Sequence, residues 1–407
     1  MSPAPELPCR VLLLSDAEAA SPAALCTAMA RSSCRSLVQD ALEQRAEAVL
    51  IWLPQDPAQL TDCLDAIAGL PEPLPVLACV PGASLGQQRS GFERGVQVWL
   101  ENAEGINAAL HWARWQFERQ QALQSRLDER RWAEQAKGVL MQACAIDEDA
   151  AHRLLREAAM QARLRMAELS RSVVQAAQLA EGVNLAGQQR MLSQRIVKLI
   201  AQRAAAIEPR RAKQLQDESA ARIEANLARL HERLPAFDLH AVNSAWGALK
   251  PLLTGKPTAE VLMQADAAAQ DLLERSEQLT HTIEAAGAGR PLHLVNVCGR
   301  QRMLSQRLAK QALLADLLPG SVGANMGESL DAFASGLAEL EAAPLSSPAI
   351  RELQAEAREE WLHLLRALRG SHGREAASGL ARSSEVLLGQ LDRLTANYQQ
   401  SLQVLLA

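Results

Sequence analysis

The spacing of apolar residues divides the chain into an N-terminal α/β part and a helical remainder. In residues 10–120, short apolar runs at 10–15, 48–54, 75–80 and 96–100 are separated by amphipathic stretches. The runs predict buried strands, and the stretches near 22–31, 57–69, 85–94 and from 104 onward predict helices. This alternation is typical of a parallel sheet covered by helices on both faces.

The chain then becomes helical for most of its length. From Ile106 to about Val139 it contains no Pro and only one Gly, and apolar residues recur among many charges. This predicts a long helix with a coiled-coil-like stripe, which favours a helix–helix contact over a solvated connector. Residues 134–177 then predict three helices joined by two turns, with Asp147 capping the second helix.

The C-terminal half is a duplication. "NLAGQQRMLSQRIVK" (184–198) matches "NVCGRQRMLSQRLAK" (296–310), and "LLERSEQLT" (272–280) matches "LLGQLDRLT" (387–395). Residues 181–285 and 290–407 are therefore two copies of one unit. Pro and Gly breakers and Leu/Ala periodicity predict an antiparallel four-helix bundle for each copy. The predicted helices lie near 183–206, 211–233, 238–254 and 257–285 in the first copy, and near 292–318, 323–342, 348–369 and 373–405 in the second.

Composition narrows the function classes. Seven cysteines without a C-x-x-C pair favour a reducing cytoplasm, and no apolar run approaches about 18 residues, so we expect no membrane partner. The N-terminal residues do not resemble a signal peptide. The eight histidines are scattered, and no P-loop or G-x-S-x-G motif occurs. We therefore expect no enzyme activity, no cofactor and no metal site.

Basic residues gather in the predicted three-helix segment. Residues 130–171 carry eight Lys and Arg against six acidic residues, in a chain whose net charge is −5. "QAKGVLM" (135–141), "AIDEDAAHRLLREAAM" (145–160) and "AELSRSVV" (167–174) together resemble an ANTAR domain. The resemblance implies a module that binds leader-mRNA hairpins and prevents transcription termination. Basic side chains suit RNA phosphates and loop bases. The candidate RNA-binding residues are Lys137, Arg156, Arg163, Arg165 and Arg171.

The strand pattern of the N-terminal part resembles a response-regulator receiver, although any small α/β domain remains an alternative. The acidic pair of a receiver is replaced by Ser15-Asp16, its third-strand Asp by Trp52 and its Lys by Asn102. Asp16 alone could not hold Mg²⁺ and orient a phosphoryl group. Asp56, just past the third strand, is the fallback acceptor. We expect a pseudo-receiver that serves docking or dimerisation, and hence a homodimer.

The repeated helix carries the candidate ligand site. Gly187 and Gly299 stand inside predicted helices, where Gly costs about 1 kcal/mol relative to Ala but permits close approach. Arg190 and Arg302 follow them, each with a planar donor fork suited to a flat oxyanion. Two such helices facing across a pseudo-twofold axis would bring both arginines together. Their repulsion would be relieved by a small anion, which would couple ligand binding to helix packing.

The motif resembles the signature helix of nitrate/nitrite sensor kinases, the NIT domain of nitrate-responsive antiterminators and the N-terminal domain of PilJ-type chemotaxis transducers. The resemblance implies a nitrate or nitrite site at Arg190, Arg302, Gly187 and Gly299. PilJ-type relatives need not bind nitrate, and the alternative is a structural helix whose arginines are solvated or pair with Glu. Arg195 and Arg307 lie about 140° around the helix, so we expect a structural or inter-bundle role for them.

These observations predict a mainly α protein with a receiver-like α/β domain, a three-helix ANTAR module and two tandem four-helix bundles. We expect the receiver-like domain at residues 1–120, with a connecting helix to about 133, and the ANTAR module at 134–180. The two four-helix units are expected at 181–288 and 289–407. The expected function is a cytoplasmic nitrate- or nitrite-responsive transcription antiterminator. The alternative is a ligand-independent helical scaffold that regulates the ANTAR module through protein contacts, with a separate sensor protein as a possible partner.

Overall fold

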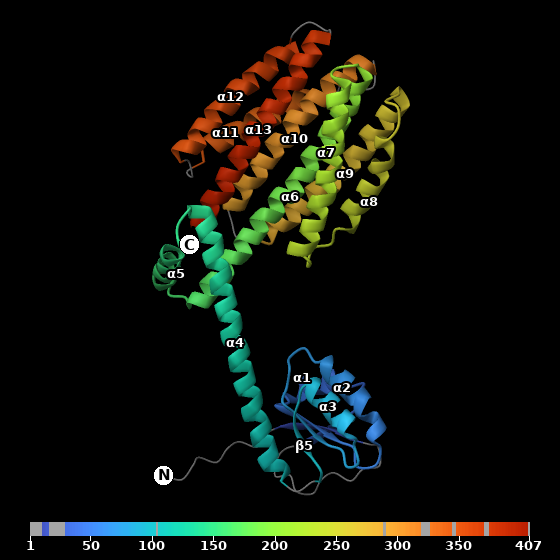
Figure 1. Ribbon diagram of the computed structural model, residues 1–407, viewed down its shortest axis with the longest axis vertical. Coiled ribbons are helices and arrows are strands. Elements are labelled where there is room, and N and C mark those ends of the chain that lie inside the picture. Colours follow the sequence, from blue (N-terminus) through green and yellow to red (C-terminus); the bar gives the residue numbers. More distant parts are fainter. Residues whose placement is uncertain are drawn as a thin grey trace. The chain divides into compact units, whose positions relative to one another are not determined.

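The computed structural model describes residues 10–15, 29–102, 105–287, 290–318, 326–343, 347–369 and 374–405 (Figure 1). The chain divides into two compact units, residues 1–129 and 130–407. Most of the described residues are helical, as the sequence predicts. No helix among the described residues is both long enough and apolar enough to cross a bilayer.

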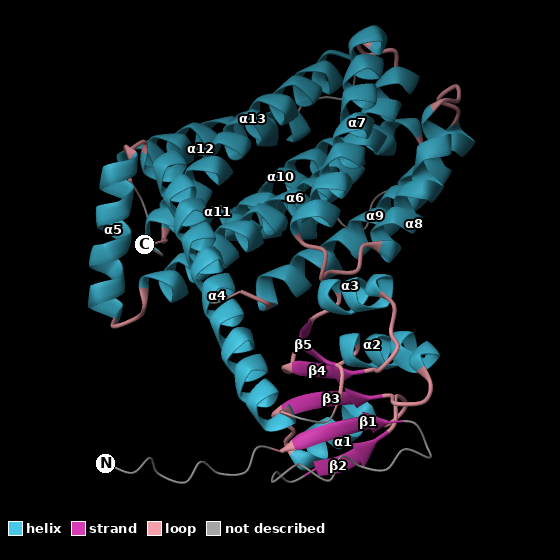
Figure 2. Cartoon of the chain, turned by 60° about the horizontal axis from the view of Figure 1, so that its bottom comes forward, coloured by secondary structure: helices cyan, strands magenta, loops and turns pink. Residues whose placement is uncertain are grey.

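The first unit contains a five-stranded parallel sheet with the strand order β2-β1-β3-β4-β5 (Figure 2). This is the doubly wound order of flavodoxin-like folds, so the receiver-like architecture is confirmed. One apolar cluster joins a sheet face to the short helices, and a second joins the opposite face to Ile106, Leu110 and Ala113 of the long helix. The elements are β1 (Val11–Ser15), β2 (Met29–Ser32), α1 (Leu37–Gln44), β3 (Ala48–Trp52), η1 (Pro57–Gln59), α2 (Leu60–Ala68), β4 (Val76–Cys79), α3 (Leu85–Glu93) and β5 (Val96–Leu100).

The end of one predicted helix of this unit is a strand instead. The stretch near 22–31 was expected to be helical, but Met29–Ser32 forms β2 at the edge of the sheet, and residues 16–28 lie outside the described part. The sequence "MARS" has no strand pattern of its own, and its conformation comes from pairing with β1. Tertiary pairing overrides local propensity here.

The second unit begins within α4 (Ile106–Cys144), the long helix that the sequence predicts. α5 (Glu148–Ala162) and α6 (Met166–Ala204) follow it. The Asp147 carboxylate accepts a hydrogen bond of 2.8 Å from the Ala150 N–H, which confirms the predicted cap. A small core that includes Leu140, Leu155 and Val173 joins the three helices. The expected three-helix module is therefore present, but its third helix continues beyond the module.

α6 runs without a break from the three-helix module into the first copy (Figure 1). The sequence predicted a separate helix starting near 183, whereas α6 starts at Met166. The remaining helices agree closely with the predicted set. They are α7 (Pro209–Arg233), α8 (His240–Leu249) with η2 (Lys250–Leu253), α9 (Ala259–Ala285), α10 (Arg290–Leu317), α11 (Met326–Glu341), α12 (Pro348–Arg369) and α13 (Arg374–Leu405).

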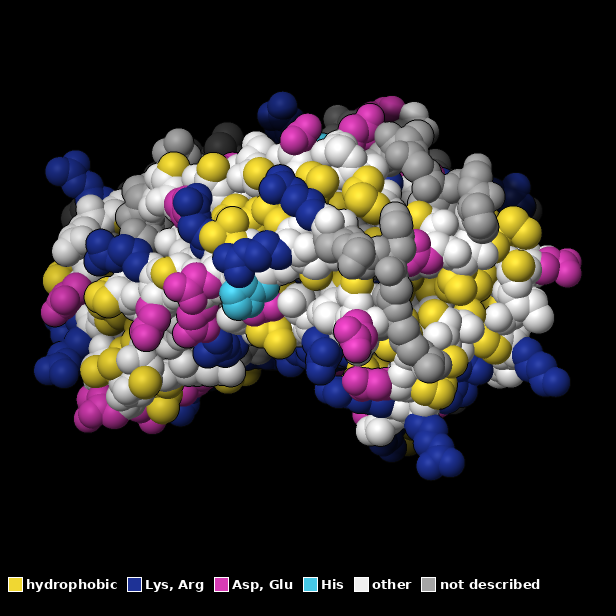
Figure 3. All heavy atoms as spheres, turned by 90° about the horizontal axis from the view of Figure 1, so that it is seen from above, with side chains coloured by type: hydrophobic (Ala, Val, Ile, Leu, Met, Phe, Trp, Pro, Cys, Tyr) yellow, Lys and Arg dark blue, Asp and Glu magenta, His cyan; other side chains and the backbone are white. Residues whose placement is uncertain are grey.

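The two four-helix units share one interior. A single apolar cluster extends from Ala180 to Tyr398 and includes residues from both copies. Its centre is the pair α6 and α10, the two helices that carry the repeated motif, which make the most extensive helix–helix contact of the chain. On the outside, Lys and Arg side chains are interspersed with Asp and Glu (Figure 3). The fold thus places the motif helices at the middle of a continuous core.

Candidate anion site between the repeat helices

α6 and α10 cross with their backbones in contact at the two motif glycines. A Cβ added at Gly187 would lie 3.7 Å from the Cα of Gly299, and a Cβ added at Gly299 would lie 3.7 Å from the Cα of Gly187. The expected close approach is present, and it is symmetric between the copies.

Both motif arginines converge on this crossing from inside the core. Arg190 is 0% and Arg302 is 1% exposed. A Cβ added at Gly299 would lie 2.9 Å from Nη2 of Arg190 and 3.5 Å from Nη2 of Arg302. The duplication therefore brings the two guanidinium groups to one place within a single chain.

Each arginine already has a carboxylate partner, a pairing that the sequence suggested only as an alternative and without naming the acids. Nη1 of Arg190 lies 2.5 Å from Oε2 of Glu277, and Nη1 of Arg302 lies 2.7 Å from Oδ1 of Asp392. The expected repulsion between the arginines is thus offset by the protein itself. A signal was available, because Glu277 and Asp392 occupy the same position of the aligned segments "LLERSEQLT" and "LLGQLDRLT".

Each arginine also donates a hydrogen bond to an asparagine of the opposite copy. Nη2 of Arg190 donates to Oδ1 of Asn296 at 2.7 Å, and Nη2 of Arg302 donates to Oδ1 of Asn184 at 2.7 Å. Asn184 and Asn296 open the two motif copies. Each guanidinium is therefore bound to a carboxylate of its own copy and to an amide of the other, which ties the copies together around a pseudo-twofold axis.

The Nε–H donor of each guanidinium is unused. The Nε atoms of Arg190 and Arg302 are buried and have no hydrogen-bond partner among the described residues. Buried donors are nearly always satisfied in proteins, and a guanidinium donor is suited to an oxyanion. The site can therefore bind a further acceptor without losing every existing contact.

The protonation states follow from burial and charge. Burial lowers the pKa of Arg190, although Glu277 acts in the opposite direction. Burial alone would raise the pKa of Glu277, but the charges and hydrogen bonds of Arg190 and Arg300 outweigh it and lower that pKa. Glu277 is thus an anion at neutral pH, so the site contains internal negative charge.

A second polar layer lies eight residues further along α6, about 12 Å away along the helix axis. Lys198 is 0% exposed, and its Nζ lies 2.5 Å from Oε1 of Glu385 and 2.6 Å from Oε1 of Gln306. Arg195 holds both oxygens of the same Glu385, at 3.0 and 2.5 Å. Burial alone would raise the pKa of Glu385, but Lys198 and Arg195 lower it to about 2. Arg195 thus makes the inter-bundle contact expected for it.

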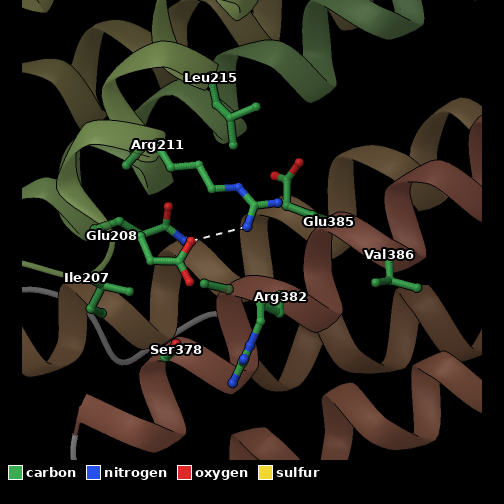
Figure 4. A pocket seen from close by; sticks show the side chains of 11 residues that line it. Ile207, Glu208, Arg211, Leu215, Ser378, Arg382, Glu385 and Val386 are labelled. Carbon is green, nitrogen blue, oxygen red and sulfur yellow. Dashed lines mark hydrogen bonds and ion pairs between the residues drawn. The ribbon is translucent and has the colours of Figure 1, made fainter.

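A pocket of about 240 Å³ opens beside this layer, between the end of α6, the start of α7 and α13. Figure 4 shows the Arg211 guanidinium extended toward Glu385 and Glu208, and Arg211 Nη1 lies 3.2 Å from Oε2 of Glu208. Neither Arg190 nor Arg302 lines it. The arginine pair is therefore enclosed, and access to it requires movement of side chains or helices.

The candidate RNA-binding residues fall into two groups. Arg156, Arg163, Arg165 and Arg171 are exposed, and Arg171 lies over the Trp132 ring, 5.7 Å from its centroid. Lys137 is only 8% exposed, and its Nζ lies 2.5 Å from Glu148 and 2.9 Å from Glu134. The arginines are available to a phosphate backbone, whereas Lys137 ties α4 to α5.

The acceptor positions of a receiver are occupied by other groups. Trp52 ends β3, and Asp16 lies outside the described residues. Asp56, the fallback acceptor, caps η1: its Oδ1 accepts from the Ala58 N–H at 3.0 Å.

Comparison with family models identifies both helical parts. Residues 121–174 match the ANTAR domain, and residues 172–271 and 292–394 match the PilJ domain, described as the N-terminal domain of type IV pili methyl-accepting chemotaxis transducers. No curated protein matches the chain. The chain thus combines one ANTAR domain with two PilJ-type segments, as the motif resemblance predicted. These are the domains of an RNA-binding antitermination regulator with a signalling module. The two matches meet at residues 172–174, inside α6.

Proposed function

We propose that this protein is a cytoplasmic transcription antiterminator that responds to nitrate or nitrite. Its ANTAR domain binds leader-mRNA hairpins, and a planar anion binds between Arg190 and Arg302. The observation that carries the proposal is the meeting of two buried guanidinium groups at the Gly187–Gly299 crossing. Their unused Nε donors supply hydrogen bonds to the anion, and the glycines let both guanidinium groups lie against the backbone.

The signal travels through α6. This helix contains the third helix of the three-helix module at one end and the anion motif at the other. Seventeen residues separate Val173 from Arg190, about 25 Å of continuous helix. A ligand that prefers one α6–α10 packing shifts the population toward that packing. The module helix then moves with α6, because no break separates them.

Titration calorimetry of the full chain with sodium nitrate, and in parallel with sodium nitrite, tests the proposal. We expect one anion per chain and loss of binding in Arg302→Gln. Arg358→Gln is the matched control, because Arg358 makes an exposed pair with Glu341 away from the motif. Absence of heat with both anions, or equal binding by Arg302→Gln, rejects the anion site.

One observation favours the scaffold alternative. Glu277 and Asp392 already neutralise the arginines without any ligand. In that case the buried network only joins the two copies, and regulation comes from protein contacts. A gel shift with a two-hairpin leader RNA separates the alternatives, because RNA binding that is the same with and without nitrate favours the scaffold.

We further propose that the protein is a homodimer through α4. Trp112 and Trp115 are stacked at 4.9 Å, and both are about half exposed, at 52% and 46%. Leu123 and Leu127 continue the exposed apolar surface. Light scattering on the full chain and on a Trp115→Glu, Leu127→Glu variant tests this: a wild-type monomer contradicts the dimer.

A further inference from the structure

Glu277 lies between two arginines, one from each copy. Its Oε2 is 2.5 Å from Nη1 of Arg190, and its Oε1 is 2.5 Å from Nη2 of Arg300. The Glu277 side chain is 35% exposed and that of Arg300 is 54% exposed. Glu277 therefore touches the buried site on one side and has a cation at the surface on the other.

Within the described part of the chain, the equivalent carboxylate has no such second cation. Asp392 occupies the place of Glu277 at Arg302, and Arg302 is its only ion-pair partner among the described residues. The position that corresponds to Arg300 in the first copy is Gln188, which accepts hydrogen bonds from Arg222 and Asn226. The two copies are thus alike in the arginine and its carboxylate partner, but only the carboxylate of the first copy, Glu277, also pairs with a second arginine.

Counting charges shows what a ligand must displace. In the buried part of the site two guanidinium groups face two carboxylates and the charges balance, whereas the Arg300 side chain is 54% exposed, so solvent screens its charge. An added anion would leave an uncompensated charge beside fully buried groups, which is strongly unfavourable. Exchange of one carboxylate for one monoanion keeps the site neutral. Glu277 leaves at the lower cost, because Arg300 retains it.

We propose that Glu277 is an internal counter-anion that a singly charged oxyanion displaces from Arg190, and that Arg300 holds Glu277 in the displaced position. This inference rests on the proposed anion site. It also assigns a selectivity: a doubly charged anion such as sulfate would have to displace Asp392 as well, and no second cation among the described residues pairs with Asp392 to receive it. The site therefore selects monoanions by charge exchange.

Glu277→Gln in the full chain tests the exchange. Removal of the competing carboxylate should tighten nitrate binding about tenfold or more, because an uncharged amide binds the guanidinium more weakly than a carboxylate does and is displaced at a lower cost. Sulfate should bind the wild type at least about tenfold more weakly than nitrate at equal ionic strength. Glu341→Gln is the matched control, since Glu341 of α11 pairs with Arg358 of α12, outside the helices that carry the site, and its nitrate affinity should equal that of the wild type.

A double-mutant cycle with Arg300 distinguishes exchange from a general effect of charge. Arg300→Gln should weaken nitrate binding in the wild-type background and have no effect in the Glu277→Gln background. If Arg300→Gln weakens binding equally in both, the arginine only attracts anions and the inference is wrong. If Glu277→Gln does not fold, Glu277→Asp carries the test, because the shorter side chain cannot bridge both arginines; the displaced carboxylate then has no cation to receive it, and nitrate binding should weaken as in Arg300→Gln.

The outcomes separate this inference from the proposed function. Nitrate that binds wild type and Glu277→Gln with equal affinity overturns the exchange and leaves the anion site intact. Nitrate that binds neither protein overturns the anion site itself. Sulfate that binds the wild type as tightly as nitrate overturns the selectivity by charge.

Discussion

Replacement of Gly299 by Ala tests whether the α6–α10 crossing is as close as the structure has it. Inside a helix, Ala is more stable than Gly by about 1 kcal/mol where the new methyl group has room. Gly389 in α13 has such room, because nothing lies within 4 Å of a Cβ added there. Gly389→Ala should therefore raise the free energy of unfolding, and it serves as the matched control.

At Gly299 the added Cβ would lie 2.9 Å from Nη2 of Arg190. That nitrogen is held by Asn296 at 2.7 Å inside the core, so it can move only by giving up a charge-assisted hydrogen bond. Loss of this bond costs about 1.5–3 kcal/mol. After the gain in helix propensity, the net destabilisation is about 0.5–2 kcal/mol. At Gly187 the nearest atom is 3.2 Å away, so Gly187→Ala should be milder.

The assay is urea unfolding followed by circular dichroism of the full chain. The predicted order of stability is Gly389→Ala, wild type, Gly187→Ala and Gly299→Ala. We also expect Gly299→Ala to lose nitrate binding, because the methyl group occupies the space beside both guanidinium groups. If Gly299→Ala is stabilised as much as Gly389→Ala, the crossing is not tight and the reasoning from the glycines is refuted.

Three further predictions concern the second polar layer and the RNA-binding module. Because the pKa of Glu385 is about 2 in the fold and about 4.3 in an unfolded chain, its stabilisation is complete above the unfolded value and is lost as pH falls toward 2. Thermal melts of wild type and Glu385→Gln should thus differ most above about pH 4.3 and converge as the pH falls from there toward 2, and a pH-independent gap would disprove the assignment. Asp147→Ala should destabilise α5 by about 1 kcal/mol, whereas Asp149→Ala should not. Amide hydrogen exchange of α5 measures the difference, and equal protection of α5 in the two variants would argue against the cap. In gel shifts at several salt concentrations, Arg163→Ala should reduce the slope of log RNA affinity against log salt concentration by about 0.7–0.9. Lys137→Ala should leave this slope unchanged, because Glu134 and Glu148 hold that lysine. Equal slopes for both variants would contradict this division.

The helices of the two copies could be predicted because their limits are local. Breakers such as Pro209 and Pro235 and the spacing of Leu and Ala contain the necessary information. The meeting of Arg190 and Arg302 was also predictable, since a repeated Gly inside a helix has few uses other than close approach.

The remaining features depend on packing between distant segments. β2 takes its conformation from β1 rather than from its own residues. Glu277 and Asp392 share a position in the two copies, but only the fold shows that this position reaches the arginines. The continuity of α6 had a local signal, because no Pro interrupts residues 166–204. The resemblance to two separate families favoured a boundary there instead.

The coupling between the anion site and the RNA-binding module is the central claim, and RNA affinity with and without nitrate measures it most directly. For the full chain, fluorescence anisotropy with a two-hairpin leader RNA should give a Kd that changes when nitrate is added. By linkage, the nitrate Kd should change by the same factor when RNA is added. Arg302→Gln should bind RNA with an affinity independent of nitrate. If nitrate binds the wild type and leaves the RNA Kd unchanged, α6 does not couple the two sites and the account is wrong.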